Sequence, residues 1–266
     1  MQSNDWYKKH GHYNPVKAQE MGVPIRISKS SFMQYLMCPR QFWWNYIALE
    51  DERMPPTPEM IRGTEVHTEL ENLYLGNEVK KIDPAIDIIL DLEKQRVKAW
   101  GDLSVVEAEV KHEVFVPEYN VVLVGKIDGV LRHPDGGLVL VELKTGKMAK
   151  SKHSRTRKEL CFYYYVFELM ECDPITHFMF LSPDCTNEDF LFSLMENKKT
   201  EVFMCEESGL SFIEPINKRS LSAFQKSFDK AVKGLREQDW SMKWNDYFCT
   251  NWCDFNMACQ TELIGG

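Results

Sequence analysis

Two carboxylates and a lysine near the middle of the chain have spacing suited to a phosphodiester-cleaving metal site. They lie in two short motifs, Gly-Lys-Ile-Asp at 125–128 and Glu-Leu-Lys-Thr-Gly at 142–146. Residues two apart on a strand project from one face, so Glu142 and Lys144 share a surface. Neighbouring carboxylates repel each other, and a hard cation such as Mg²⁺ or Mn²⁺ relieves that repulsion at Asp128 and Glu142. The alternative interpretation is a buried Asp–Lys–Glu salt-bridge network.

His67 is a further candidate metal ligand. It follows Gly63 by four residues and shares a helical face with Glu71. A lone helical histidine is more often an ordinary surface or core residue than a ligand. The neighbouring motifs nevertheless favour a metal-binding role for His67.

Four of the eight cysteines lie near the two ends of the chain. Cys38 stands alone, whereas Cys249, Cys253 and Cys259 are separated by gaps of three and five residues. Four thiolates can hold a zinc ion or an iron–sulfur cluster, and unligated thiols are the third interpretation. The remaining cysteines follow no ligand spacing and are predicted to be core residues: Cys161, Cys172, Cys185 and Cys205. Three tryptophans are predicted to shield a bound group or simply to pack in the core: Trp43, Trp44 and Trp252.

Basic residues are concentrated just after Lys144. No acidic residue interrupts them before Glu159. We predict that this strip contacts DNA phosphates, the alternative being a merely solvated face. The predicted DNA-binding residues are Lys147, Lys150, Lys152, Arg155, Arg157 and Lys158.

The bulk composition is that of a globular protein. The chain has 266 residues, of which 44% are hydrophobic and 27% are charged. A net charge of −8 argues against a general nucleic-acid coat, yet a local basic strip can still steer DNA. No apolar run is long enough to cross a membrane, and no signal peptide is evident, so a cytoplasmic location is expected. Eight cysteines in a reducing compartment do not favour a disulfide framework.

The order of predicted elements is helices, a strand meander, a helix, further strands and a last helix. Helices are expected from Ser28 (capped by Ser28 or Ser30) and over Thr64–Leu75, Pro84–Trp100, Arg155–Glu171 and Leu221–Leu235. Strands are expected at Val105–Val116, Asn120–Leu131, Leu138–Leu143, Thr176–Leu181, Phe190–Met195 and Glu201–Cys205. The stretch Asp51–Pro58 is expected to be a loop. This order predicts an α/β or α+β fold with a central mixed sheet flanked by helices.

Taken together, the motifs resemble the RecB-type nuclease family of the PD-(D/E)XK superfamily, in particular its iron–sulfur branch. That branch includes CRISPR-adaptation exonucleases and AddB-like nuclease domains. The family order is a cysteine, Gly-x-x-x-His, Gly-x-x-Asp, (Asp/Glu)-x-Lys-Thr-Gly, Gln-x-x-x-Tyr and three terminal cysteines. The chain follows this order over residues 28–260. A glutamate, Glu159, stands at the family glutamine, and the first gap between the terminal cysteines holds three residues where the family commonly has two.

The resemblance implies a restriction-endonuclease-like core over 28–260. The mixed polar and aromatic residues before it, with Pro15, Gly22 and Pro24, predict an irregular arm at 1–27, and residues 261–266 are expected to be a tail. The resemblance also implies roles for individual residues. The implied metal ligands are His67, Asp128, Glu142 and the backbone carbonyl of Leu143. The implied catalytic residues are Asp128, Glu142, Lys144, Glu159 and Tyr163. The implied ligands of a [4Fe–4S] cluster that joins the N- and C-terminal segments are Cys38, Cys249, Cys253 and Cys259.

The expected function is a Mg²⁺- or Mn²⁺-dependent DNA exonuclease that acts on single-stranded ends. The chain has no Gly-x-x-x-x-Gly-Lys-(Ser/Thr) phosphate loop, so a helicase, recombination or CRISPR-adaptation partner would have to supply any ATP-driven step. The alternatives are a structure-specific endonuclease of the same fold, a catalytically silent iron–sulfur DNA-binding subunit, or a zinc-stapled interaction module.

Overall fold

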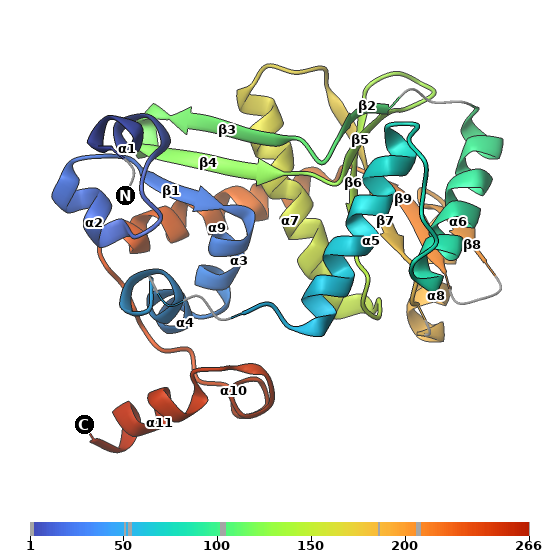
Figure 1. Cartoon of the computed structure of the whole chain (residues 1–266). Coiled ribbons are helices and arrows are strands. Elements are labelled where there is room, and N and C mark those ends of the chain that lie inside the picture. The colour runs from blue at the N-terminus through green and yellow to red at the C-terminus, as the bar shows by residue number, and fades with distance from the viewer. Residues whose placement is uncertain are drawn as a thin grey trace. The chain divides into compact units, whose positions relative to one another are not determined.

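The computed structural model describes residues 3–50, 52, 55–101, 105–185, 187–205 and 209–265 (Figure 1). The chain divides into two compact units. Unit 1 comprises Met1–Pro55, Glu113–Val124 and Gln225–Gly266, and unit 2 comprises Pro56–His112 and Gly125–Phe224. The prediction of one nuclease domain over 28–260 stays a prediction.

Unit 2 is built on a mixed six-stranded sheet. Its strands, in sheet order, are β2 (Val105–Ala108), β5 (Gly129–Arg132), β6 (Leu138–Leu143), β7 (Ile175–Ser182), β9 (Leu210–Pro215) and β8 (Glu201–Met204). Strands β6 and β7 pair in parallel, and the other neighbours pair antiparallel. The expected mixed sheet with flanking helices is therefore confirmed.

Helices cover both faces of this sheet (Figure 1). They are α5 (Pro58–Tyr74), α6 (Pro84–Trp100), α7 (Lys150–Leu169) and α8 (Glu188–Met195). On one face, Leu70 of α5 and Leu92 of α6 share a buried cluster with Val141 and Leu143 of β6. The opposite face carries α7, whose His153 ring packs edge-on against phenylalanines of β7 and β9.

Because side chains alternate along β6, this central strand contributes residues to both faces of the sheet. All six of its residues are buried. Leu143 joins the cluster beneath α5 and α6. Its neighbour Glu142 projects from the face that α7 covers, beside Phe180 of β7. The end of the strand thus presents an acidic side chain to the α7 layer and an apolar side chain to the α5–α6 layer.

Unit 1 combines short helices with a three-stranded sheet of order β1-β4-β3. Its elements are α1 (Asn4–His10), α2 (Pro15–Met21), β1 (Ile25–Ser28), α3 (Lys29–Met37), α4 (Pro39–Trp43), a π-helix (Trp44–Ala48), α10 (Asp246–Trp252) and α11 (Asn256–Gly265). Three further elements begin in one unit and end in the other: β3 (Lys111–Val116), β4 (Val121–Lys126) and α9 (Lys218–Arg236). Strands β1 and β4 pair in parallel, with Ile27 opposite Leu123.

Proline interrupts the helix that the sequence predicts from Ser28. Ser28 caps α3 as expected, through a reciprocal capping box with Ser31. The helix stops at Met37, because the residue before a proline is driven out of the helical region. Cys38 is therefore extended, with φ −156° and ψ 112°, and Pro39 begins α4. This break sets a cysteine apart from both helices.

Several predicted elements require correction. Residues 3–27 of the predicted irregular arm are ordered into two short helices, capped by Ser3 and Asn14, and the start of β1, and residues 1 and 2 lie outside the described residues. The predicted strand Phe190–Met195 is helix α8, whose first turn Asn187 caps. The predicted strands Val105–Val116 and Asn120–Leu131 each break in two and contribute to different sheets.

Other expectations hold or lie partly outside the described residues. Helix α6 has the predicted bounds. Strand β9 was not predicted. Within the predicted loop Asp51–Pro58, residues 51, 53 and 54 lie outside the described residues, and Pro58 already belongs to α5. Residue 266 of the predicted tail also lies outside them. None of the described helices combines the length and apolar character needed to span a bilayer.

Candidate metal centre

Three side chains of unit 2 bring metal-binding atoms together. His67 extends from α5, Glu109 follows β2, and Asp128 lies immediately before β5. His67 Nδ1 is 3.1 Å from Asp128 Oδ1 and 3.4 Å from Glu109 Oε1. One ligand atom from each residue lies within 4.8 Å of the others. An imidazole with two carboxylates suits Mn²⁺ and, through the oxygens, Mg²⁺, so these residues fit a divalent ion.

Backbone hydrogen bonds hold Asp128 at the end of the sheet. The side chain is buried, and its Oδ2 accepts a hydrogen bond of 2.6 Å from the backbone N–H of Leu143. The Glu109 backbone N–H donates to the carbonyl of Asp128 at 3.3 Å. The carboxylate is thus fixed from the end of β6, while its other oxygen faces His67.

The charges around His67 explain its protonation. Burial alone would lower the pKa of His67, but hydrogen bonds and charges from Asp128 and Glu109 outweigh burial and raise this pKa to about 10. Burial likewise opposes ionisation of Glu109, yet His67 and Lys126 lower its pKa. In the absence of an ion, a proton on His67 therefore balances part of the carboxylate charge, and a bound cation would have to replace it.

Lys144 lies between two buried carboxylates. Its Nζ is 2.7 Å from Glu142 Oε1 and 2.6 Å from Glu159 Oε2. The expected proximity of Glu142 and Lys144 is present, and Glu159 of α7 joins them. Glu142 lies with Lys144 rather than in the three-residue group of His67, Glu109 and Asp128. The metal-binding roles of Glu142 and the Leu143 carbonyl stay predictions.

Replacing Glu159 with glutamine tests what its carboxylate contributes. Glutamine keeps an oxygen that can accept from Lys144 but removes a negative charge that offsets the ammonium. We expect Glu159→Gln to cleave DNA at the wild-type rate or up to about tenfold faster, equivalent to about 1.4 kcal/mol. Single-turnover cleavage of a labelled oligonucleotide measures this, with Glu168→Gln, a change on the last turn of the same helix, as the control. A rate more than tenfold below wild type would show that the charge itself is required.

Tyr163 occupies a supporting position. Its hydroxyl donates a hydrogen bond to the backbone carbonyl of Lys126, two residues before Asp128. Its ring packs so closely on Gly125 that a Cβ there would lie 2.9 Å from a ring carbon. Gly129 makes the same allowance for Tyr74, with a distance of 2.6 Å. The two glycines therefore allow aromatic rings of α7 and α5 to pack directly on the backbone of the segment that carries Asp128. Tyr163 also holds that backbone through its hydrogen bond.

The basic strip separates into groups with different surroundings. Lys147, Lys150 and Arg155 are exposed. Lys152 is half-buried and donates a 2.7 Å hydrogen bond to the carbonyl of Gly146. The Arg157 guanidinium is engaged elsewhere, at 2.5 and 2.7 Å from the two carboxylate oxygens of Glu214. Lys158 is half-buried. The exposed members are thus the ones best placed to meet a phosphate backbone.

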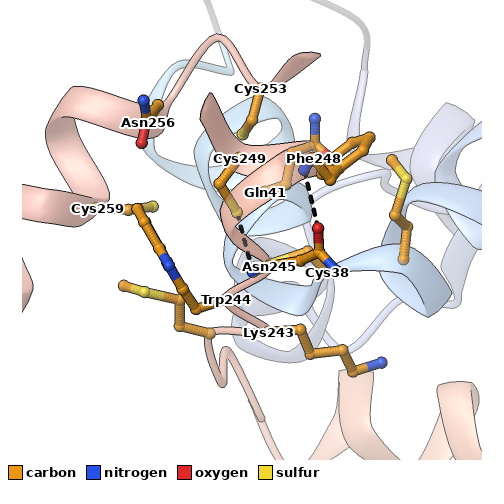
Figure 2. A pocket seen from close by; sticks show the side chains of 12 residues that line it. Cys38, Gln41, Lys243, Trp244, Asn245, Phe248, Cys249, Cys253, Asn256 and Cys259 are labelled. Atoms are coloured by element: carbon orange, nitrogen blue, oxygen red, sulfur yellow. Dashed lines mark hydrogen bonds between the residues drawn. The ribbon is translucent and has the colours of Figure 1, made fainter. Parts of the chain in front are cut away.

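Four cysteines of unit 1 line a second site (Figure 2). The cavity has a volume of about 370 Å³, and its lining includes Cys38, Cys249, Cys253 and Cys259, all with free thiols. Cys38 comes from the break before α4, Cys249 lies in α10, Cys253 ends α10, and Cys259 lies in α11. The four cysteines that the sequence nominates therefore line one cavity.

The environment of these thiols suits a positively charged group. Burial raises the pKa of Cys253, and the neighbouring thiols of Cys249 and Cys38 raise it further. Several thiolates would repel one another here, and a cationic centre would remove that cost. The backbone N–H of Asn245 donates to Cys249 Sγ at 3.4 Å, the type of contact that tunes thiolate ligands.

The surroundings of the cavity differ in part from expectation. Trp252 is 66% exposed, so its predicted shielding role is wrong. Trp244 lines the cavity instead, with Phe248. Trp44 stacks on Phe255 at 5.7 Å. Among the remaining cysteines, Cys161 and Cys185 are buried as predicted, whereas Cys172 is exposed and Cys205 is half-buried.

Comparison with known proteins decides the family. The sequence model of the PD-(D/E)XK nuclease superfamily matches residues 90–260, well over half of the chain. The chain belongs to the PD-(D/E)XK nuclease superfamily. As a member it is a nuclease, a hydrolase of nucleic acids, and the superfamily uses divalent metal ions. The matched segment contains Asp128, Glu142 and Lys144 as well as the three terminal cysteines.

Two solved structures are also similar to this PD-(D/E)XK nuclease. The structure of SSO0001 is 16% identical, covers 88% of this chain and 85% of its own, and has a TM-score of 0.44. A phage-related exonuclease from Haemophilus somnus 129PT is 10% identical, covers 83% of this chain and 97% of its own, and has a TM-score of 0.36. No curated protein matches the sequence.

Sequence reasoning missed two residues of the metal centre. Glu109 contributes a carboxylate beside His67 and Asp128, and Lys126 forms an ion pair with that carboxylate. Glu109 lies outside every recognised motif, within a run that otherwise resembles a continuous strand. Lys126 lies inside the Gly-x-x-Asp motif, so its proximity to Asp128 could be predicted from the sequence, but its ion pair with Glu109 could not.

Proposed function

We propose that this nuclease is a Mg²⁺- or Mn²⁺-dependent DNA exonuclease of the RecB type that acts on single-stranded ends. The observation that carries the proposal is that the Asp128 carboxylate and the Lys144 ammonium both lie at the end of β6. Asp128 is bound there by the N–H of Leu143, and Lys144 follows in the next position, between Glu142 and Glu159. The order of motifs that resembles the RecB-type family supports the finer assignment to exonucleases.

The side chains divide the chemical work. A bound divalent ion would polarise the scissile phosphate and acidify the attacking water. His67 and Asp128 would hold that ion, with Glu142 and the Leu143 carbonyl as the further predicted ligands. Lys144 offers an ammonium that can contact the phosphate or orient the water, and Glu142 and Glu159 fix its direction. Tyr163 keeps the Asp128 segment in place from behind.

We also propose a [4Fe–4S] cluster on the four cysteines, which would place the protein in the iron–sulfur branch. The proposal of a cluster rather than a zinc ion rests on spacing: Cys38 stands alone far upstream, and gaps of three and five residues separate the terminal cysteines, whereas tight Cys-x-x-Cys pairs would favour zinc. The cluster would join the segment around Cys38 to the C-terminal helices. A helicase, recombination or CRISPR-adaptation complex is the proposed setting for such a nuclease.

Digestion of defined DNA tests the activity. End-labelled single- and double-stranded DNA and circular DNA of the same sequence are incubated with the protein, with Mn²⁺, with Mg²⁺ and with chelator. We expect metal-dependent shortening of the single-stranded ends and no cleavage of the circles. Cleavage of circles would instead identify an endonuclease, and no cleavage of any substrate would leave a DNA-binding subunit.

The exposed basic residues should contribute to DNA affinity. Replacing Lys147, Lys150 and Arg155 with alanine should weaken binding and lower the salt dependence, because each lost phosphate contact reduces the slope of log K against log salt by about 0.7 for a single strand. Fluorescence anisotropy at several salt concentrations, with the non-cleaving ion Ca²⁺, measures both quantities. The matched control is the double change of Lys198 and Lys199 to alanine, exposed lysines of the same unit. Wild-type affinity and slope in the triple variant would mean that the strip is only a solvated surface.

A further inference from the structure

We propose that Glu109 is a ligand of the divalent ion held by His67 and Asp128, an inference that rests on the proposed metal-dependent function. The Glu109 carboxylate reaches both partners: His67 Nδ1 lies 3.4 Å from its Oε1, and the three ligand atoms lie within 4.8 Å of one another. Only 8% of its side chain is exposed. Two carboxylates and one neutral imidazole balance the charge of a divalent ion and give it three protein donors.

The backbone at Glu109 is shaped for this orientation. Its φ of 53° lies in the left-handed region, which residues other than glycine rarely occupy. Such a strained conformation persists only where the surroundings fix it. Here the Glu109 N–H donates to the backbone carbonyl of Asp128. The two acidic residues are therefore locked together through the main chain, independently of any contact between their side chains.

Lys126 occupies the place of a counter-ion. Its ammonium pairs with Glu109 Oε2, and 56% of its side chain is exposed. Because its side chain is already half in solvent, the Lys126 ammonium can become hydrated when a divalent ion takes its carboxylate. A lysine and a metal ion thus compete for Glu109. Removal of the Lys126 ammonium should therefore strengthen metal binding.

Direct titration with Mn²⁺ in the absence of DNA separates these roles. Wild type, Glu109→Gln, Lys126→Gln and Glu107→Gln are compared by calorimetry and by electron paramagnetic resonance of free Mn²⁺. Glu107 is the matched control, because it lies two residues earlier, on β2, and its carboxylate contacts His112 at 2.7 Å instead. Even partners beyond the ligands change metal affinity by about 10–100-fold, so loss of a ligand should weaken binding at least about tenfold.

The expected pattern is weaker Mn²⁺ binding in Glu109→Gln, tighter binding in Lys126→Gln and wild-type affinity in Glu107→Gln. Circular dichroism confirms that each variant is folded. Equal Mn²⁺ affinity in wild type and folded Glu109→Gln overturns the role of Glu109 but leaves the proposed nuclease site standing. If Glu109→Gln does not fold, wild-type Mn²⁺ affinity in Lys126→Gln also overturns the proposal that Glu109 is a ligand. Absence of Mn²⁺ binding in the wild type removes both proposals.

Discussion

Cleavage should stop when Lys144 or Asp128 is replaced with alanine. Lys144→Ala removes the ammonium that is proposed to contact the attacked phosphate, and we expect the single-turnover rate to fall at least about 10³-fold, or about 4 kcal/mol. DNA affinity in Ca²⁺ should stay close to wild type, since the ammonium acts in the chemical step. Asp128→Ala should lose cleavage together with Mn²⁺ binding, because it removes the carboxylate that joins His67 to the end of β6.

Folding has to be controlled in this experiment. Lys144→Ala leaves Glu142 and Glu159 close together without the ammonium that lies between them, which can destabilise a buried site. The double variant Lys144→Ala, Glu159→Gln removes one carboxylate charge as well and keeps the site closer to neutral. Thermal unfolding identifies the variants that fold. A folded Lys144→Ala or Asp128→Ala protein that cuts at the wild-type rate would eliminate the proposed site.

Cys38→Ala should cost the protein both its iron and much of its stability. Anaerobically purified wild type is expected to be yellow-brown with about four iron atoms per chain, and the variant colourless. A group that links Cys38 to Cys249 closes a loop of more than two hundred residues. Chain entropy sets the stabilisation from such a link at about 5 kcal/mol as an upper estimate. The variant should therefore unfold at a clearly lower temperature.

Cys172→Ala is the matched control for the cysteine experiment. Cys172 is exposed, belongs to unit 2 and follows no ligand spacing. Its replacement should change neither iron content nor the unfolding temperature. Iron and zinc are measured together by mass spectrometry. A wild-type protein with one zinc and no iron, or equal metal content in Cys38→Ala, would contradict the cluster.

The sequence predicts the structure best where several local signals agree. Helix α6 has its predicted bounds because Asp83 caps it, Pro84 starts it and Gly101 follows it. The prediction of a strand at Phe190–Met195 is wrong because a short apolar run suits a strand and a buried helix equally well. The Asn187 side chain caps the first turn and stabilises the helix. The family resemblance implied that His67 and Asp128 bind one ion, and the structure places the two side chains 3.1 Å apart.

Glu109 illustrates what sequence reasoning lacks. Its position depends on a left-handed residue between β2 and β3, and non-glycine residues give little local signal for that conformation. The pairing of its main chain with Asp128 joins positions nineteen residues apart that pattern analysis treats as separate strands. The replacement of the family glutamine by Glu159 was visible in the sequence, but its contact with Lys144 required the fold.

The division into units has a consequence for biosynthesis. The side chains of the candidate metal centre and its surroundings, from His67 to Tyr163, belong to unit 2, whose last segment ends at Phe224. The final cysteine, Cys259, follows 35 residues later in the order of translation. Because domains tend to fold as their segments leave the ribosome, the sheet that carries Asp128 can form while the cysteine cavity still lacks three of its four thiols. Iron for the proposed cluster would then reach a chain whose unit 2 is already folded.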